Sequence, residues 1–93
     1  MKIELAKNEN IHFVGIGGIG MSGLALIMKG MGFKIQGSDI SNNKNIERLK
    51  KNRIKILIGH SKKNITKATI LVISSAIKKN NPEVQQAKIK NLP

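Results

Sequence analysis

Four glycines near the start of the chain have the spacing of a phosphate-binding turn. Gly15, Gly17 and Gly20 fit the pattern G-x-G-x-x-G, and Gly18 adds a fourth glycine between them. Glycine has no Cβ, so backbone N–H groups can approach an anion closely. The first turn of a following helix adds unpaired donors and a partial positive charge. We therefore expect the backbone from Gly17 to Ser22 to bind a nucleotide diphosphate.

A carboxylate follows these glycines at the distance that a dinucleotide-type fold requires. Asp39 lies 19 residues beyond Gly20, near the end of a second predicted strand, where such folds hold a ribose hydroxyl. Both features have a second interpretation. Asp39 opens a loop of turn-forming residues, and its carboxylate can cap that loop instead. The glycines can serve tight turns and close helix–strand packing.

The glycine turn needs a strand before it and a helix after it, and the sequence supplies both. Residues 10–16 form an apolar run that predicts a buried parallel strand. Residues 18–31 have helical periodicity, and Gly32 is placed to end that helix. We expect Gly20 and Gly23 to let the helix lie close to the sheet. Its core-facing side is predicted to consist of Leu24, Ile27, Met28 and Met31.

The rest of the chain continues the alternation of strands and helices. Strands are predicted at 33–38, 55–58 and 69–73, helices at 44–52 and 82–90, and a short turn or helix at 61–66. This order predicts an α/β fold: a small Rossmann-like domain with a mostly parallel sheet of four to five strands and helices on both faces. The run 69–73 is expected to lie centrally, beside 10–16. Because the chain stops where another strand should begin, we expect it to be the first domain of a longer protein.

Small or polar residues follow each predicted strand, at the sheet edge where ligands of such folds bind. They belong to four segments: 15–22, Ser38-Asp39, Gly59-His60 and 74–76. His60 is either a surface histidine or a contact to a nucleotide base, whereas His12, inside a strand, is expected to be structural. No metal site is expected, since cysteine is absent and only five residues are acidic.

The formal charge of +12 comes mostly from lysines that are spread along the whole chain. Its two aromatic residues, Phe13 and Phe33, lie in predicted strands and form no stacking platform, so specific nucleic-acid binding is not expected. No apolar stretch approaches the ~20 residues of a membrane span, and no signal peptide is evident. The absence of cysteine fits a cytoplasmic location, which we expect.

Four blocks, in order and spacing, resemble the Mur ligase family of peptidoglycan synthesis. The blocks are residues 11–23, 37–40, 58–60 and 72–77, the last followed by Asn81-Pro82-Glu83. Within that family, Gly20-Met21-Ser22 favours the ligases that add L-alanine to UDP-N-acetylmuramate. The resemblance implies that residues 1–93 form the N-terminal, UDP-substrate-binding domain, with the ATP-binding and C-terminal domains absent.

The resemblance also implies a set of substrate-binding residues. Backbone N–H groups from Gly17 to Ser22 would hold the diphosphate, Asp39 the ribose or uracil, and His60 the uracil. Ser75 and Ala76 would line the floor below the phosphates or the sugar. The full set is Gly15, Gly17, Gly18, Ile19, Gly20, Met21, Ser22, Ser38, Asp39, His60, Ser75 and Ala76.

In the reaction that the resemblance implies, ATP phosphorylates the muramoyl carboxylate, and the amine of L-alanine attacks the acyl phosphate. The sequence contains no G-x-x-x-x-G-K-[ST] loop, so ATP and Mg²⁺ are expected to bind elsewhere in the parent enzyme. This chain alone is expected to be inactive and to bind no cofactor. The alternative is an NAD(P)-binding domain of an oxidoreductase or redox sensor, which shares the glycines and the carboxylate. The doubled Gly17-Gly18 and the four blocks argue against it.

Overall fold

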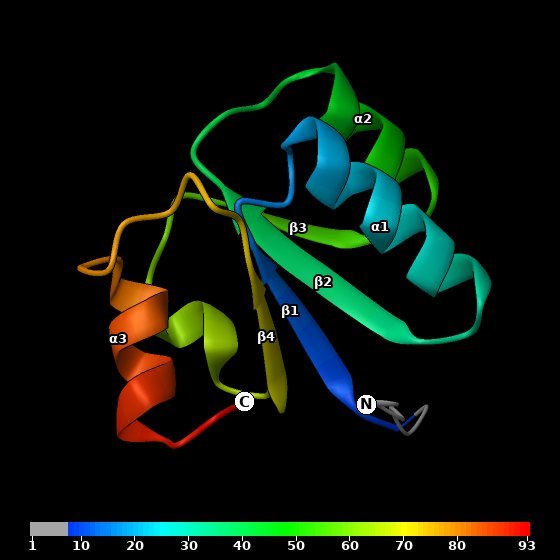
Figure 1. Cartoon of the computed structure of the whole chain (residues 1–93). Helices are drawn as coiled ribbons and strands as arrows, with labels where there is room; N and C mark the ends of the chain where they lie inside the picture. The colour runs from blue at the N-terminus through cyan, green and yellow to red at the C-terminus, as the bar shows by residue number, and fades with distance from the viewer. Residues whose placement is uncertain (1–7) are drawn as a thin grey trace.

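The computed structural model describes residues 8–93 as a parallel sheet with helices packed against it (Figure 1). Residues 1–7 of the expected domain lie outside the described residues. The elements, in order, are β1 (Asn10–Val14), α1 (Ile19–Gly30), β2 (Lys34–Asp39), α2 (Lys44–Lys51), β3 (Lys55–Ile58), the 3₁₀ helix η1 (Lys62–Ile65), β4 (Ile70–Ile73) and α3 (Pro82–Ile89). The predicted α/β fold and order of elements are confirmed.

The four strands are all parallel and lie in the order β3-β2-β1-β4. β1 therefore pairs on both edges, with Phe13 in register with Gly37 of β2 and Val72 of β4. β4 lies beside β1, as predicted, but the prediction of a central position is wrong. In the sheet formed by the described residues β4 is an edge strand. A strand that is covered on both faces has an apolar sequence whether it lies in the centre or at the edge of the sheet. The apolar run alone therefore could not distinguish a central strand from an edge strand.

Helices cover both faces of the sheet, as Figure 1 shows, with α1 and α2 on one side and α3 and η1 on the other. Side chains alternate along β1, so Ile11 and Phe13 belong to one core cluster and Val14 to the other. The cluster beneath α1 and α2 contains Ile11, Phe13, Ile16, Ala25, Ile35, Ile46, Leu49 and Ile54. The cluster beneath α3 and η1 contains Val14, Ile65, Ala68, Leu71 and Ala87.

The predicted core-facing side of α1 is wrong. Leu24, Ile27 and Met31 are 42%, 63% and 54% exposed, and of the predicted four only Met28 packs against the core. The buried residues of α1 are Ser22 and Ala25. Their small side chains allow the helix to lie close to the sheet, which leaves the larger side chains on the outer surface.

Gly20 and Gly23, near the start of α1, have open space around them. A Cβ at Gly20 or Gly23 would meet nothing within 4 Å, so these glycines do not contact the sheet, contrary to the prediction. Gly32 follows the helix with φ of +95°, as predicted for the residue that ends it. None of the helices in residues 8–93 is long and apolar enough to cross a membrane.

The turn after β1 is anchored to the end of β2. The amides of Gly15 and Ile16 both donate to the carbonyl oxygen of Ser38, at 2.9 and 3.0 Å. The side chain of Ile16 lies over Gly37, where a Cβ would stand only 2.5 Å from Ile16 Cδ1. Gly37 is therefore required for this packing, which fixes the glycine turn against the sheet edge.

Candidate functional site

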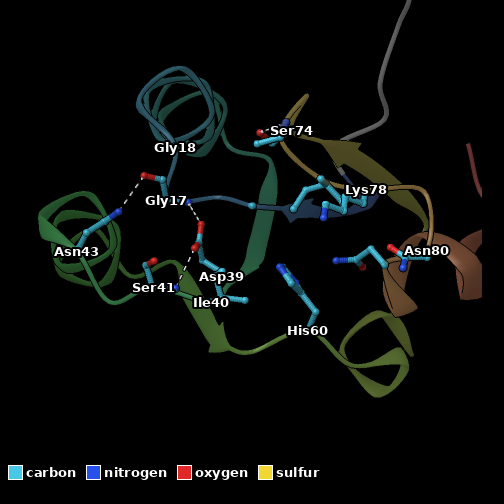
Figure 2. Close-up of a pocket in the computed structure, with 14 residues that line it drawn as sticks. Gly17, Gly18, Asp39, Ile40, Ser41, Asn43, His60, Ser74, Lys78 and Asn80 are labelled. Carbon is cyan, nitrogen blue, oxygen red and sulfur yellow. Dashed lines mark hydrogen bonds between the residues drawn. The ribbon is translucent and has the colours of Figure 1, made fainter.

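A pocket of about 510 Å³ opens at the carboxyl ends of the strands (Figure 2). The glycine turn forms one wall, and the loops after β2, β3 and β4 form the others. Its position is the one predicted from the residues that follow each strand. It is lined by Gly15, Gly17, Gly18, Asp39, Ile40, Ser41, Asn43, His60, Ser74, Ala76, Ile77, Lys78, Asn80 and Asn81.

The structure brings half of the predicted site residues into this pocket and places the others around it. Gly15, Gly17, Gly18, Asp39, His60 and Ala76 line it. Ile19, Gly20 and Met21 form the first turn of α1, which begins directly after Gly18. Ser22 and Ser38 are fully buried, and Ser75 is exposed outside the lining. Substrate contact by any of these residues stays a prediction.

Three backbone N–H groups at the start of α1 have no hydrogen-bond acceptor within residues 8–93. They belong to Ile19, Gly20 and Met21, and the N-cap residue Gly18 supplies no side chain to cap them. The neighbouring amides of the predicted cradle are already paired within the chain. Gly17 N donates to Asp39 Oδ2 at 2.8 Å, Gly18 N to Gly15 O at 3.4 Å, and Ser22 N to Gly18 O at 2.8 Å. The donors available to an anion are therefore the three of the first helical turn.

Two glycines of the motif have a packing role. Gly15 has φ of +81°, and a Cβ there would lie 3.0 Å from Ser74 Cβ. A Cβ at Gly17 would lie 2.9 Å from Asp39 Oδ2 and 3.0 Å from Ile46 Cδ1. Gly20 has open space around it. The packing interpretation therefore applies to Gly15 and Gly17, whereas phosphate binding at Gly20 stays a prediction.

Asp39 caps the local backbone and also lines the pocket. Its Oδ1 accepts from the amide of Ser41 at 3.0 Å, and its Oδ2 accepts from Gly17 N (Figure 2). Each carboxylate oxygen has a second lone pair, so these bonds leave Asp39 able to accept from a ligand. The two alternatives for Asp39, a loop cap and a ligand contact, are structurally compatible.

Sequence reasoning missed Lys78, whose side chain lies across the pocket from Gly17 and Asp39 (Figure 2). It is the one lysine or arginine among the lining residues, so it supplies positive charge opposite the glycine turn. The available signal was the length of the loop after β4, which continues beyond Ala76 to the α3 cap at Asn81. Ser74 belongs to the segment 74–76 that was predicted at this edge. The other lining residues missed from the sequence are Ile40, Ser41, Asn43, Ile77, Asn80 and Asn81.

A fully buried carboxylate lies directly behind the pocket. Glu83 Oε1 accepts from His12 Nε2 and from the Ser38 hydroxyl, both at 2.6 Å. Its Oε2 accepts from Asn64 Nδ2 at 2.7 Å and from the amide of Ser61 at 3.1 Å. Burial by itself raises the pKa of Glu83, but hydrogen bonds from His12, Ser38 and Asn64 lower it to about 2. His12 is buried in this network, in agreement with the structural role predicted for it.

The sequence predicted a helix at 82–90, and Glu83 lies in the first turn of α3. The helix begins with a side-chain cap, since Asn81 Oδ1 accepts from Glu83 N at 2.9 Å and Pro82 occupies the first turn. The Glu83 side chain, however, is turned inward. Within residues 8–93 no group of three or more histidine, cysteine, aspartate or glutamate side chains could hold a metal ion.

A parallel sheet with a glycine turn and a pocket at its carboxyl edge defines a Rossmann-like α/β domain of the type that binds nucleotides there. Comparison with known proteins gives the family. The family described as "Mur ligase family, catalytic domain" matches residues 10–93. The chain belongs to the Mur ligase family.

The known proteins and solved structures that this chain resembles have related names. A UDP-N-acetylmuramate--L-alanine ligase of Pelagibacter ubique is 77% identical over 93 residues, which are 100% of this chain and 20% of that protein. The enzyme of the same name from Aquifex aeolicus is 54% identical over 85 residues, 91% of this chain and 19% of that protein. The crystal structure of UDP-N-acetylmuramate-alanine ligase MurC from Thermotoga maritima superposes with a TM-score of 0.86 at 37% identity, over 90% of this chain and 20% of that one.

A second solved structure that the chain resembles carries the name of a different ligase. It is the UDP-N-acetylmuramate:L-alanyl-gamma-D-glutamyl-meso-diaminopimelate ligase from Neisseria meningitides, with a TM-score of 0.85 and 31% identity. The match covers 91% of this chain and 27% of that one. The chain thus spans about a fifth of the length of the curated relatives that it matches.

Proposed function

We propose that residues 1–93 form the N-terminal domain of a UDP-N-acetylmuramate–L-alanine ligase and bind the uridine diphosphate part of its substrate. The observation that carries the proposal is the set of unpaired amides at Ile19, Gly20 and Met21, next to a pocket of about 510 Å³. Such a volume is in the range of roughly 300–1,000 Å³ that small-molecule sites occupy. The names of the relatives supply the identity of the nucleotide.

In this proposal the diphosphate binds at the start of α1. The three amides point along a helix of 12 residues, whose dipole adds partial positive charge at this end. Lys78 approaches from the opposite wall and neutralises part of the negative charge. Gly15, Gly17 and Gly18 shape the turn that brings the helix to this position, and Ser22 and Ser38 support it from the interior.

The nucleoside occupies the remainder of the pocket. Asp39 accepts from the ribose or the uracil, His60 contacts the uracil, and Ser75 and Ala76 lie below the phosphates or the sugar. Three of these four residues line the pocket, and Ser75 lies directly before Ala76. The proposal assigns no catalytic residue to this chain.

The chemistry belongs to the whole enzyme. ATP would phosphorylate the muramoyl carboxylate, and L-alanine would displace the phosphate through its amine. The sequence given has no phosphate loop of the G-x-x-x-x-G-K-[ST] type, so ATP and Mg²⁺ would be held by other parts of the enzyme. This chain contributes by positioning, since binding the distant nucleotide places the reacting carboxylate. A cytoplasmic location, where ATP is available, is part of the proposal.

Isothermal titration of the 93-residue chain with UDP-N-acetylmuramate, NAD and NADP tests the proposal. We expect UDP-N-acetylmuramate to bind and NAD and NADP not to bind. Binding of NAD or NADP instead of UDP-N-acetylmuramate would support the oxidoreductase alternative. Lys78→Ala should weaken UDP-N-acetylmuramate binding about tenfold, as loss of a charge-assisted contact does. Lys55→Ala is the matched control, because Lys55 begins β3 at the other end of the sheet.

A further inference from the structure

The buried carboxylate of Glu83 fixes which nitrogen of His60 carries a proton. His60 Nδ1 lies 2.9 Å from Ser38 Oγ and 3.3 Å from Glu83 Oε2. The Ser38 hydroxyl donates its proton to Glu83 Oε1, at 2.6 Å, and so offers only a lone pair to His60. An ionised carboxylate can only accept. Both neighbours of Nδ1 are therefore acceptors, and Nδ1 must be the protonated nitrogen.

The other hydrogen bonds of the network fix which groups donate a proton to Glu83. Gln36 Nε2 donates to His12 Nδ1 at 2.8 Å and to the carbonyl oxygen of Asn64 at 2.9 Å. Because His12 Nδ1 accepts, His12 Nε2 carries the proton and donates to Glu83. Both oxygens of Glu83 thus accept hydrogen bonds, so Ser38 must be the donor in its bond with Glu83.

The other nitrogen of His60 has no partner within residues 8–93. Every buried polar side-chain atom in residues 8–93 has a hydrogen-bond partner, whereas His60 Nε2 has none. His60 Nε2 is therefore not buried, and His60 lines the pocket. The His60 side chain is only 12% exposed, so its orientation is well restricted. A neutral imidazole with a proton on Nδ1 presents a lone pair at Nε2.

We propose that Glu83 is a positioning residue that, with Ser38, holds His60 as the Nδ1–H tautomer and so makes the pocket selective for a base with an imide N–H donor. The inference rests on the proposed function and deepens it. Uracil carries such a donor at N3, where cytosine has an acceptor. The pocket would therefore separate uridine from cytidine nucleotides by the direction of a single hydrogen bond.

The first test needs no ligand. Long-range ¹H–¹⁵N spectra of the chain at neutral pH report which nitrogen of each histidine is protonated. We expect His60 to carry its proton on Nδ1 and His12 on Nε2. A neutral His60 with its proton on Nε2 would overturn the inference, whether or not the chain binds nucleotides.

The second test compares UDP, CDP and N3-methyl-UDP, followed through backbone amide shifts. An unpaired polar group in the bound state weakens binding by about tenfold or more, so we expect CDP and N3-methyl-UDP to bind that much more weakly than UDP. Equal affinities, with the amides of Ile19 to Met21 still responding, would overturn the inference and leave the proposed function standing. No response of those amides to UDP would contradict the proposed function, and the tautomer would still decide the inference.

Variants separate positioning from general stability. In Glu83→Gln only one of the two terminal atoms can accept hydrogen bonds. With the NH₂ group directed at Ser38, the Ser38 hydroxyl accepts from it and can donate its own proton to His60 Nδ1. We expect this variant to lose most of the preference for UDP over CDP. Thr69→Val is the control, since the Thr69 hydroxyl bonds only to the backbone of Asn10, outside the Glu83 network. It should lower the melting temperature and keep the preference, and loss of the preference in this control would contradict a specific role for Glu83.

Discussion

At the scale of single residues, Asp39 combines a structural and a proposed binding role. Its two oxygens cap the amides of Gly17 and Ser41, and it also lines the pocket. Asp39→Asn retains one acceptor oxygen, so one of the two amides loses its partner. We expect a stability loss of about 1 kcal/mol, measured by denaturant unfolding.

The same variant separates the nucleoside from the diphosphate. Asp39→Asn should weaken UDP binding about tenfold, since a charged acceptor becomes neutral. Its affinity for inorganic pyrophosphate should be unchanged, because the three amides of α1 are unaffected. Titration calorimetry with both ligands measures this, and an unchanged affinity for UDP would remove Asp39 from the site.

The glycines of the motif should respond differently to substitution. A Cβ at Gly17 would meet Asp39 and Ile46 at 2.9 and 3.0 Å, so Gly17→Ala should destabilise the chain by roughly 1–3 kcal/mol. A Cβ at Gly20 meets nothing within 4 Å, so Gly20→Val should fold with nearly unchanged stability. Its side chain would obstruct the diphosphate, and UDP binding should be lost. Thermal unfolding and titration of both variants provide the check, and a Gly20→Val chain that still binds UDP would place the cradle elsewhere.

At the scale of elements, α3 is attached to the sheet through a buried charge. The pKa of Glu83 is about 2 in the folded chain, against an ordinary value of 4.5. A folded-state pKa below the unfolded one stabilises the chain above the unfolded value, and this stability is lost as pH falls from about 4.5 towards 2. The difference corresponds to about 3 kcal/mol.

Denaturant unfolding between pH 7 and pH 2 measures this contribution. Glu83→Gln should be less stable at neutral pH and should lose most of the acid dependence below pH 5. Glu47→Gln is the matched control, because Glu47 is exposed on α2 and should leave the profile unchanged. An identical acid profile in Glu83→Gln and the original chain would contradict the proposed pairing of this carboxylate.

The elements show what the sequence could and could not predict. Strands were predictable because Ile11 to Val14 form a local apolar run, and the ends of α1 and α3 because Gly32 and Asn81 act on their own backbone. The inward face of α1 was not predictable from periodicity. Hydrophobicity favoured its large residues, whereas the distance between helix and sheet selected the small Ser22 and Ala25.

At the scale of the whole molecule, the site is assembled from segments that are far apart in the sequence. The sequence predicted the edge of the sheet and residues such as Asp39 and His60, since each lies at or just beyond the end of its own strand. It did not predict the role of Glu83, whose partners His12 and Ser38 precede it by 71 and 45 residues. Long-range hydrogen bonds of this type leave no local pattern. Lys78 was missed for the related reason that its loop returns to the pocket only in the folded chain.

The central claim is that the first turn of α1 holds a diphosphate, and one measurement tests it most directly. Backbone ¹H–¹⁵N spectra of the 93-residue chain, recorded during a titration with UDP, follow each amide separately. We predict the largest shifts at Ile19, Gly20 and Met21, with smaller ones at Asp39 and His60. Shifts confined to the lysine-rich surface, or unchanged amides at the start of α1 under saturating UDP, would contradict the account.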